Sequence, residues 1–183
     1  MPEIIVIILY ILLGLLGLGF LALLMSFVVL LVLRVPFVRT PKKSIEALLA
    51  TKLIGSQDVV YDLGAGDGKF LQRIVKATGC RGEGFEISPL FWFLGEFRAA
   101  FSQHWQMHLV NFMNVDFSPA TVIFYFLAPA GIPNLAQKLE TETRPGQTVI
   151  SYGFEMPDWK PVQIIDPQPD RPTGSKFFVY KKT

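Results

Sequence analysis

The chain has 183 residues, 51% of them hydrophobic, and a formal net charge of +2. Residues 34–183, which follow an apolar N-terminal stretch, suffice for one domain with a single core but not for two. They hold all 17 lysines and arginines and every acidic residue except Glu3. This mild balance argues against a nucleic-acid partner, which would require a concentrated basic face. One cysteine, Cys80, excludes an internal disulfide and agrees with a reducing compartment.

The N-terminal stretch from Ile4 to Leu33 carries no charge and is rich in Leu, Ile and Val. As a helix rising about 1.5 Å per residue it would reach roughly 45 Å, against a hydrocarbon core of about 30 Å. A cleaved signal peptide is disfavoured, because its apolar core would be about 7 to 15 residues long behind a basic start. We therefore predict a transmembrane anchor over 4–33, a neck and pre-domain helix over 34–57, and a folded domain over 58–183.

Charge placement sets the direction of this anchor. Only Glu3 precedes the span, whereas five basic residues follow it closely: Arg34, Arg39, Lys42, Lys43 and Lys52. The positive-inside rule then places the domain on the cytoplasmic face, or on the equivalent matrix face of an organelle. The same basic residues would hold it near anionic lipid. We expect a single-pass membrane protein with the lipid bilayer as one partner.

Beyond the neck, apolar periodicity predicts strands that alternate with helices. Strands are expected over 59–63, 82–86, 107–112, 121–127, 148–153, 162–165 and 176–180, and helices over 42–53, 69–78, 88–103 and 132–141. This alternation indicates an α/β fold with a doubly wound, mostly parallel sheet that binds ligands at its carboxyl edge. The last two strands, joined by Pro167 to Gly174, are expected to form an antiparallel edge pair.

Several patterns are expected to be structural rather than functional. Apolar residues recur at helical spacing in the helix over 88–103, and we expect them to pack against the sheet: Phe91, Phe93, Leu94, Phe97 and Phe101. His104 and His108 have no cysteine or carboxylate at metal-ligand spacing, so no metal is expected. Cys80 is expected to be buried.

The most informative motif runs from Val59 to Phe70. An apolar strand breaks into three alternate glycines, Gly64, Gly66 and Gly68, and a helical pattern follows. Such a turn lets the backbone approach a nucleotide-like ligand closely, and the N–H groups that begin the helix can bind a carboxylate or phosphate. Glu86 follows at the end of the next strand, where an acidic side chain can bind ribose hydroxyls.

The glycine spacing distinguishes the cofactor classes. A dinucleotide fingerprint requires a glycine where this chain has Lys69, and a Walker loop is absent. The pattern Asp-Leu-Gly-x-Gly-x-Gly with a later acidic residue resembles S-adenosylmethionine-dependent methyltransferases of the seven-strand class (class I). The alternatives are glycines that serve geometry alone and a nicotinamide site. The resemblance implies a cofactor-binding set comprising Tyr61, Asp62, Gly64, Ala65, Gly66, Gly68, Glu86 and Asp116.

Within this set the resemblance assigns separate roles. Asp62 and the glycine turn would receive the methionine end of S-adenosyl-L-methionine, and Glu86 the ribose. Asp116, ahead of the fourth strand, would approach the adenine amino group. The other interpretation of Asp116 is that it caps the turn at Ser118-Pro119.

Further segments narrow the resemblance to a small family. They are Pro36-Phe37-Val38, Gly84-Phe85-Glu86-Ile87-Ser88-Pro89, Val115-Asp116-Phe117, Phe126-Leu127-Ala128-Pro129 and Pro157-Asp158-Trp159-Lys160-Pro161. In order and spacing they resemble the membrane-anchored protein-lysine methyltransferases whose mitochondrial members modify the adenine nucleotide translocase and the ATP synthase c-subunit. The domain over 58–183 would then be the methyltransferase domain.

The same resemblance implies where the methyl group is transferred. The transfer site would be lined by residues after the fourth strand and by Glu155 to Trp159, so the candidate catalytic residues are Phe126, Leu127, Ala128, Pro129 and Trp159. Trp159 could equally be a core residue. The chain departs from the family at Ser88-Pro89-Leu90, where Asn-Pro-Trp is usual, and this leaves the particular substrate open.

Three functions are therefore considered. The favoured one is methylation of a lysine in an integral membrane protein near the bilayer surface. The second is methylation of a lipid-soluble small molecule, such as a quinone precursor or a phospholipid headgroup, for which an anchor is equally useful. The third is a non-enzymatic, cofactor-binding assembly factor. The short connection between the fifth and sixth strands leaves little room for a lid over a small substrate, which favours a macromolecular acceptor.

Overall fold

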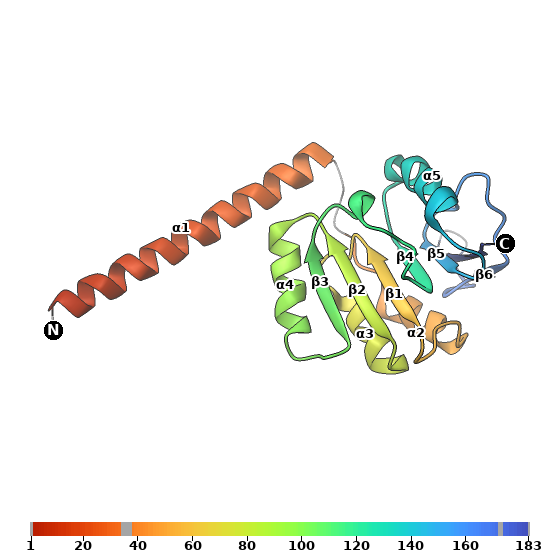
Figure 1. Cartoon of the computed structure of the whole chain (residues 1–183), viewed down its shortest axis with the longest axis horizontal. Helices are drawn as coiled ribbons and strands as arrows, with labels where there is room; N and C mark the ends of the chain where they lie inside the picture. Colours follow the sequence, from red (N-terminus) through yellow and green to blue (C-terminus); the bar gives the residue numbers. More distant parts are fainter. Residues whose placement is uncertain (1, 34–37, 172–173, 183) are drawn as a thin grey trace.

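A computed structural model describes residues 2–33, 38–171 and 174–182. The long helix α1 (Pro2–Leu33) extends away from an α/β domain that contains the rest of the described chain (Figure 1). Within α1, the segment Glu3–Met25 is wholly unburied and is long and apolar enough to cross a membrane. Arg34, Pro36 and Phe37 lie outside the described residues.

The domain is built on a seven-stranded sheet in the order β3-β2-β1-β4-β5-β7-β6. The first five strands pair in parallel, and β7 is antiparallel to both β5 and β6. This confirms the predicted class I fold and the antiparallel pair at its edge, with β7 rather than β6 beside β5. The strands are β1 (Val59–Leu63), β2 (Arg81–Glu86), β3 (Trp105–Leu109), β4 (Val122–Tyr125), β5 (Thr148–Tyr152), β6 (Gln163–Ile165) and β7 (Phe177–Lys181).

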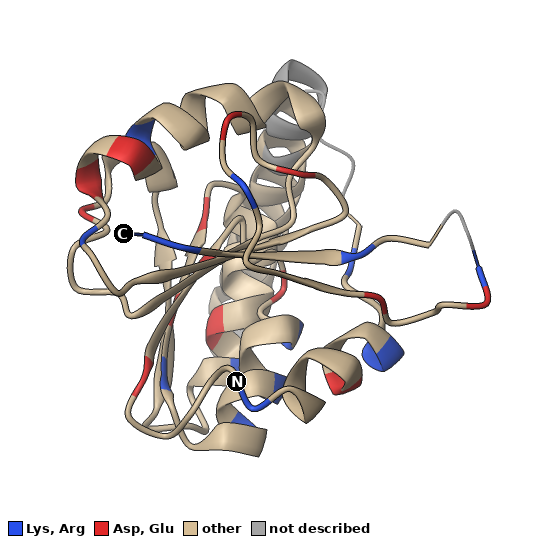
Figure 2. Cartoon of the chain, turned by 90° about the vertical axis from the view of Figure 1, so that its right-hand side faces the viewer, with Lys and Arg blue, Asp and Glu red and all other residues tan. Residues whose placement is uncertain are grey.

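Helices cover both faces of the sheet and enclose two hydrophobic cores. One face carries α2 (Lys42–Ala50), α3 (Lys69–Thr78) and α4 (Pro89–Ala99), and the other carries α5 (Ile132–Glu142) (Figure 1). Side chains that alternate along β1 supply both cores, since Val60 packs with the first and Tyr61 with the second. Figure 2 shows lysine and arginine interspersed with aspartate and glutamate around the domain.

Two helices end earlier than the sequence predicts. The helix α2 stops at Ala50, where the Thr51 hydroxyl donates to the Leu48 carbonyl and Lys52 adopts a left-handed φ of 56°. The helix α4 stops at Ala99, and the Ser102 N–H donates to the Ala99 carbonyl in the following turn. Side-chain and turn hydrogen bonds thus replace the helical ones before the apolar pattern ends.

The expectation that the apolar residues of α4 pack against the sheet is wrong for most of them. Phe93, Leu94, Phe97 and Phe101 are exposed, whereas the small residues Gly95 and Ala99 are buried. At Gly95 a Cβ atom would stand 2.8 Å from the Met107 side chain, so the helix lies too close to β3 for a larger residue on that side. The apolar spacing therefore marks an outward face. Two short 3₁₀ helices, η1 (Phe112–Asn114) and η2 (Pro129–Gly131), complete the elements.

Candidate active site

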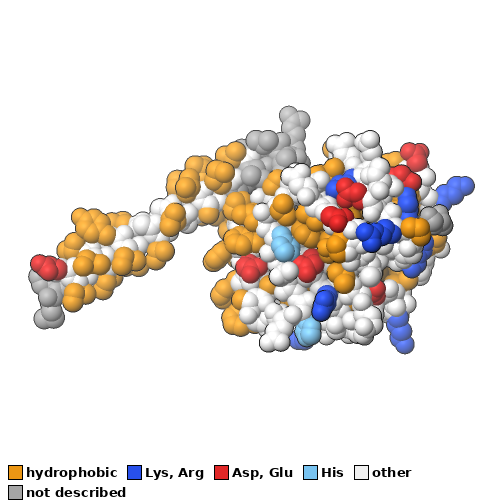
Figure 3. All heavy atoms as spheres, in the orientation of Figure 1, with side chains coloured by type: hydrophobic (Ala, Val, Ile, Leu, Met, Phe, Trp, Pro, Cys, Tyr) orange, Lys and Arg blue, Asp and Glu red, His pale blue; other side chains and the backbone are white. Residues whose placement is uncertain are grey.

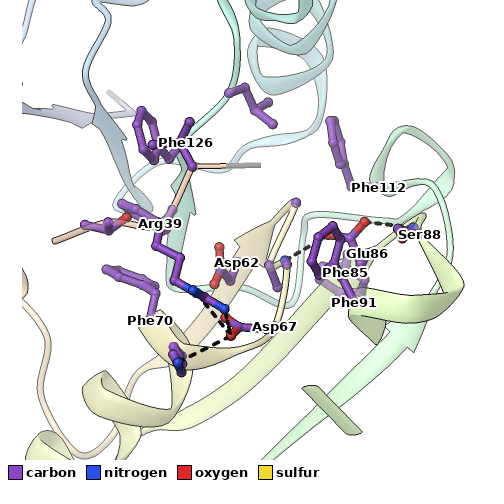
Figure 4. Close-up of a pocket in the computed structure, with 18 of the residues that line it drawn as sticks. Arg39, Asp62, Asp67, Phe70, Phe85, Glu86, Ser88, Phe91, Phe112 and Phe126 are labelled. Carbon is purple, nitrogen blue, oxygen red and sulfur yellow. Dashed lines mark hydrogen bonds and ion pairs between the residues drawn. The ribbon is translucent and has the colours of Figure 1, made fainter. Parts of the chain in front are cut away.

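A cavity of about 750 Å³ opens at the carboxyl edge of the sheet. It lies where β1, β2 and β4 end and α3 begins, and residues of the pre-domain segment and of η1 also line it (Figure 4). Ligand sites commonly have volumes of about 300–1,000 Å³ and lie at this edge of doubly wound sheets. The cavity therefore has the place and size of a cofactor and substrate site.

The glycine turn shapes the floor of the cavity. Gly64, Gly66 and Gly68 have φ angles of 78°, 56° and 72°, in the left-handed region that glycine adopts without a steric penalty. The N–H groups of Gly64 and Ala65 donate to the Phe85 carbonyl at 2.9 and 3.0 Å, which fastens the turn to β2. Gly68 directly precedes α3, and Lys69 and Phe70 in the first turn of that helix line the cavity.

Glu86 holds the turn from the other side. Its Oε2 accepts from the Gly66 N–H at 2.8 Å, and its Oε1 accepts from the N–H groups of Ile87 and Ser88 at 2.9 and 2.7 Å. Burial raises the pKa of Glu86, and the three backbone hydrogen bonds oppose that rise. Oε1 already accepts two hydrogen bonds, whereas Oε2 accepts one and keeps a second lone pair, so a ribose hydroxyl can still donate to Glu86 there.

Asp62 is the most unusual group in the cavity. It is only 3% exposed, and its Oδ2 has no hydrogen-bond partner among the described residues. Burial, with the nearby Glu86 charge as a smaller cause, raises the pKa of Asp62 to about 8. A buried carboxylate oxygen without a partner is costly. The site is therefore arranged for a ligand that brings a positive charge or a donor to Asp62.

Three basic side chains surround Asp67, and one of them, Arg39, belongs to the pre-domain segment (residues 38–41) that precedes α2. The buried Asp67 carboxylate accepts from Arg39 Nη2 at 2.8 Å and lies 3.3 Å from Arg98 Nη2 and 3.8 Å from Lys69 Nζ. Figure 4 shows the Arg39 side chain reaching Asp67 among the residues that line the cavity. Because Arg39 precedes α2, this contact fixes the segment that follows the apolar helix.

The structure brings together most, but not all, of the sequence-predicted residues. The cavity is lined by Asp62, Gly64, Ala65, Gly66, Glu86, Phe126, Leu127 and Ala128. Tyr61, Gly68 and Pro129 lie beside these residues but do not line it. Tyr61 belongs to the second hydrophobic core, where its ring packs 4.9 Å from that of Phe85, a residue that does line the cavity. Gly68 packs against Trp105, whose ring would stand 2.8 Å from an added Cβ atom.

Asp116 and Trp159 lie elsewhere. The Asp116 carboxylate is exposed, accepts from the N–H and hydroxyl of Ser118, and has a lowered pKa mainly because of that backbone hydrogen bond. This is the turn-capping arrangement. The Trp159 ring packs 6.1 Å from that of Tyr180, with Lys182 Nζ 5.2 Å from its centroid. Neither residue lines the cavity, nor do the others between Glu155 and Asp158.

Five other residues line the cavity that the sequence did not predict as site residues. Arg39, Phe70, Phe91, Phe112 and Asn134 all line the cavity, although they come from five separate segments. Phe112 follows the end of β3, and a position just after a parallel strand is one that sequence can indicate as part of a ligand site. Arg39 carried no local signal, because only the folded domain places it beside Asp67.

The cavity fits S-adenosyl-L-methionine on its own chemistry. The Asp62 carboxylate, whose Oδ2 has no partner among the described residues, suits the ammonium of an amino acid moiety, and Glu86 Oε2 in the same cavity can accept from a ribose hydroxyl. The lining also includes the apolar residues Ile87, Phe112 and Met113. When bound there, this cofactor supplies an electrophilic methyl group.

The fold and this site define a class I S-adenosylmethionine-dependent methyltransferase. A model of the ANTKMT methyltransferase domain matches residues 62–163 of the chain. The chain belongs to the ANTKMT family of S-adenosylmethionine-dependent protein-lysine N-methyltransferases.

Individual relatives agree with this assignment. A protein-lysine N-methyltransferase of Saccharolobus islandicus (strain REY15A) is 33% identical over 140 residues, which cover 72% of this chain and 84% of the relative. The adenine nucleotide translocase lysine N-methyltransferase of Mus musculus is 30% identical over 144 residues, 76% of this chain and 62% of that protein. The ATP synthase c-subunit lysine N-methyltransferase of Xenopus laevis is 29% identical over 134 residues, 72% of this chain. The match covers 57% of the Xenopus protein, so it spans less than two thirds of either animal relative.

A solved structure supports the fold and the cofactor. An RNA methyltransferase from Salinibacter ruber, in complex with S-adenosyl-L-homocysteine, superposes with a TM-score of 0.71 at 28% identity. The superposition covers 79% of this chain and 93% of that one.

Proposed function

We propose that the protein methylates a lysine side chain of an integral membrane protein close to the bilayer surface. The supporting observation is that the segment after α1 forms part of the cavity wall. Val38, Arg39, Thr40 and Pro41 line the same cavity as Asp62. Five residue steps separate Leu33 from Val38, and an extended chain spans at most about 18 Å over that length. The end of α1 is thus tethered within a short distance of the site.

The arrangement proposed in the membrane follows from α1. Residues 4–33 form a single-pass anchor, 34–57 the neck and pre-domain helix, and 58–183 the methyltransferase domain on the cytoplasmic or matrix face. The observations behind this proposal are the unburied apolar helix and the basic residues that follow it. We expect the protein to resist carbonate extraction. We also expect the domain to be protected from protease added outside intact vesicles. Digestion of the domain from outside would contradict the orientation.

The residues at the end of β4 are proposed to receive the acceptor. A lysine must lose its proton before it attacks, which costs roughly 4–5 kcal/mol at pH 7 from a pKa near 10.4. Phe126, Leu127 and Ala128 offer an apolar wall, and desolvation there lowers the pKa of the incoming amine.

Packing behind this wall fixes its position. The Phe126 ring meets the Tyr152 ring edge-on at 4.9 Å, and the Tyr152 hydroxyl lies 2.9 Å from the Ser44 hydroxyl of α2. The pre-domain helix α2 therefore supports the acceptor wall through Tyr152. A positioned wall of this kind holds the nucleophile in line with the methyl group and excludes water.

Labelled-methyl transfer tests the proposal. The full chain, reconstituted in vesicles with membrane proteins, is supplied with methyl-labelled cofactor, and the label is separated into protein, lipid and RNA fractions. Label on lysine of a membrane protein is expected. Asp62→Asn should abolish it, whereas Asp170→Asn, the same change at an exposed position, should not. Label only in lipid would favour the small-molecule alternative.

A further inference from the structure

The outward face of α4 carries a run of large apolar side chains. Phe93, Phe97 and Phe101 follow one another at intervals of four residues and are 60%, 63% and 83% exposed. Leu94, between the first two, is also exposed, and the rings of Phe97 and Phe101 pack edge-on at 5.7 Å. These four residues, three on α4 and Phe101 in the turn directly after it, form the α4 apolar face. Exposed aromatic clusters of this kind usually mark an interaction surface.

The packing of α4 shows that this face does not serve the fold. The helix contacts the sheet through Gly95 and Ala99, and Trp92 Nε1 donates to the Met107 carbonyl at 3.3 Å. An amphipathic helix normally turns its large apolar residues toward the core and its polar residues toward solvent. In this segment the large apolar residues face outward instead. Only a membrane or another molecule could therefore bury these four side chains.

The two charged residues of α4 are both used within the domain. Glu96 Oε2 accepts from the Met107 N–H at 3.3 Å, and Arg98 Nη1 donates to the Asp67 carbonyl at 2.5 Å. Arg98 also pairs with the Asp67 carboxylate. These contacts draw both charges toward the domain, which leaves the α4 apolar face suited to a non-polar environment.

The position of α1 identifies that environment. The helices α1 and α4 contact each other, and the side chains of α1 from Ile4 to Met25 are almost all exposed and uncharged. Figure 3 shows hydrophobic side chains continuing from α1 onto the part of the domain where Figure 1 places α4. We propose that the α4 apolar face docks on the bilayer that α1 crosses, with its phenylalanines inserted among the lipid headgroups. Aromatic side chains favour this interfacial depth.

Docking at a second point would orient the cavity. The anchor alone is one point of attachment, whereas a second contact determines which face of the domain meets the membrane. The helix α4 begins directly after Ser88, whose N–H donates to Glu86 at 2.7 Å, so the docked helix adjoins the cofactor pocket. The proposal rests on α1 being a membrane span, and it adds a contact that determines which acceptors can reach the site.

Fluorescence depth measurement on the full chain tests this contact. In a Cys80→Ala background, Phe97→Cys is labelled with bimane and reconstituted into vesicles of phosphatidylcholine and phosphatidylglycerol that contain nitroxide-labelled lipid. Gln137→Cys, an exposed position on α5 across the sheet, is the matched control. Bimane at position 97 should be quenched severalfold more strongly than at position 137. Equal quenching at both positions would overturn the proposal.

Two further readouts distinguish membrane docking from self-association and from a loss of fold. Spin labels at position 97 that broaden one another at low protein density would show a second copy on this face, and would also overturn the proposal. Replacing Phe93, Phe97 and Phe101 together with serine should reduce transfer to a membrane-embedded acceptor at least fivefold and leave cofactor affinity unchanged. The depth measurement needs no acceptor, so it tests membrane docking even if no lysine methylation is detected. Loss of the protein from carbonate-washed vesicles would instead show that α1 is not a span.

Discussion

The Gly66 N–H donates to Glu86 Oε2 at 2.8 Å, across twenty positions of sequence. This bond joins the glycine turn after β1 to the end of β2, and both line the cavity. The turn and the acidic residue are thus one structural unit. A change at Glu86 would disturb the backbone that meets the cofactor as well as remove a hydrogen-bond acceptor.

The first prediction concerns this unit. Glu86→Ala should weaken S-adenosylmethionine binding by about 2–3 kcal/mol, because a hydrogen bond to a charged group contributes about 1.5–3 kcal/mol and the turn also loses its support. Titration calorimetry measures the change. Glu83→Ala, on the same strand but paired with His108 and Gln106 at the surface, should leave affinity within twofold. Equal effects of the two changes would contradict the assignment of the ribose to Glu86.

The second prediction uses the pKa of Asp62, which burial raises from 3.8 to about 8. Between these values the folded protein keeps a proton on Asp62 that the unfolded chain has released, so raising the pH through this window lowers the free energy of unfolding. Without cofactor, the melting temperature should therefore fall from pH 5 to pH 8, and it should fall less in Asp62→Asn. Identical slopes in the two proteins would show that Asp62 does not titrate this way.

The same group should control how cofactor affinity depends on pH. An ammonium beside Asp62 favours its ionised form, so binding below pH 8 releases a proton and affinity should rise between pH 6 and pH 7.5. In Asp62→Asn the affinity should be low and nearly independent of pH over this range. Calorimetry in buffers of different ionisation enthalpy measures how many protons are released on binding. If the same release persisted in Asp62→Asn, Asp62 would be excluded as its source.

The fourth prediction concerns the pre-domain segment. Arg39→Ala removes the contact that holds this segment to Asp67, and cofactor affinity should fall severalfold because the cavity wall becomes free to open. The Arg39 side chain is about half exposed, so the effect on the free energy of unfolding should stay near 1 kcal/mol or below. Lys43→Ala serves as the control, because it removes an exposed cation from the first turn of the adjoining helix α2. Unchanged affinity in Arg39→Ala would show that the wall is held by other contacts.

The fifth prediction distinguishes the two interpretations of Asp116. Its carboxylate caps the turn at Ser118 and does not line the cavity. Asp116→Ala should therefore leave cofactor affinity within about twofold and lower the melting temperature slightly, because the turn at Ser118 loses its cap. A tenfold loss of affinity without loss of stability would restore Asp116 to the adenine site.

The sequence alone determined the fold class and half of the site. Strand alternation and the spacing of Gly64, Gly66 and Glu86 are local features, because a tight turn needs left-handed residues and a parallel sheet brings strand ends to one edge. The apolar helix was equally visible, since composition suffices to detect it.

Only the tertiary structure decided which side chains meet. Arg39 reaches Asp67 across twenty-eight positions, and no local pattern encodes that pairing. Phe93 and Phe97 of α4 have the spacing of a buried face, yet they point outward, because the helix lies against Met107 through Gly95 instead. Periodicity shows that one face of a helix is apolar, but the space available on each side of the helix determines whether that face is buried in the domain.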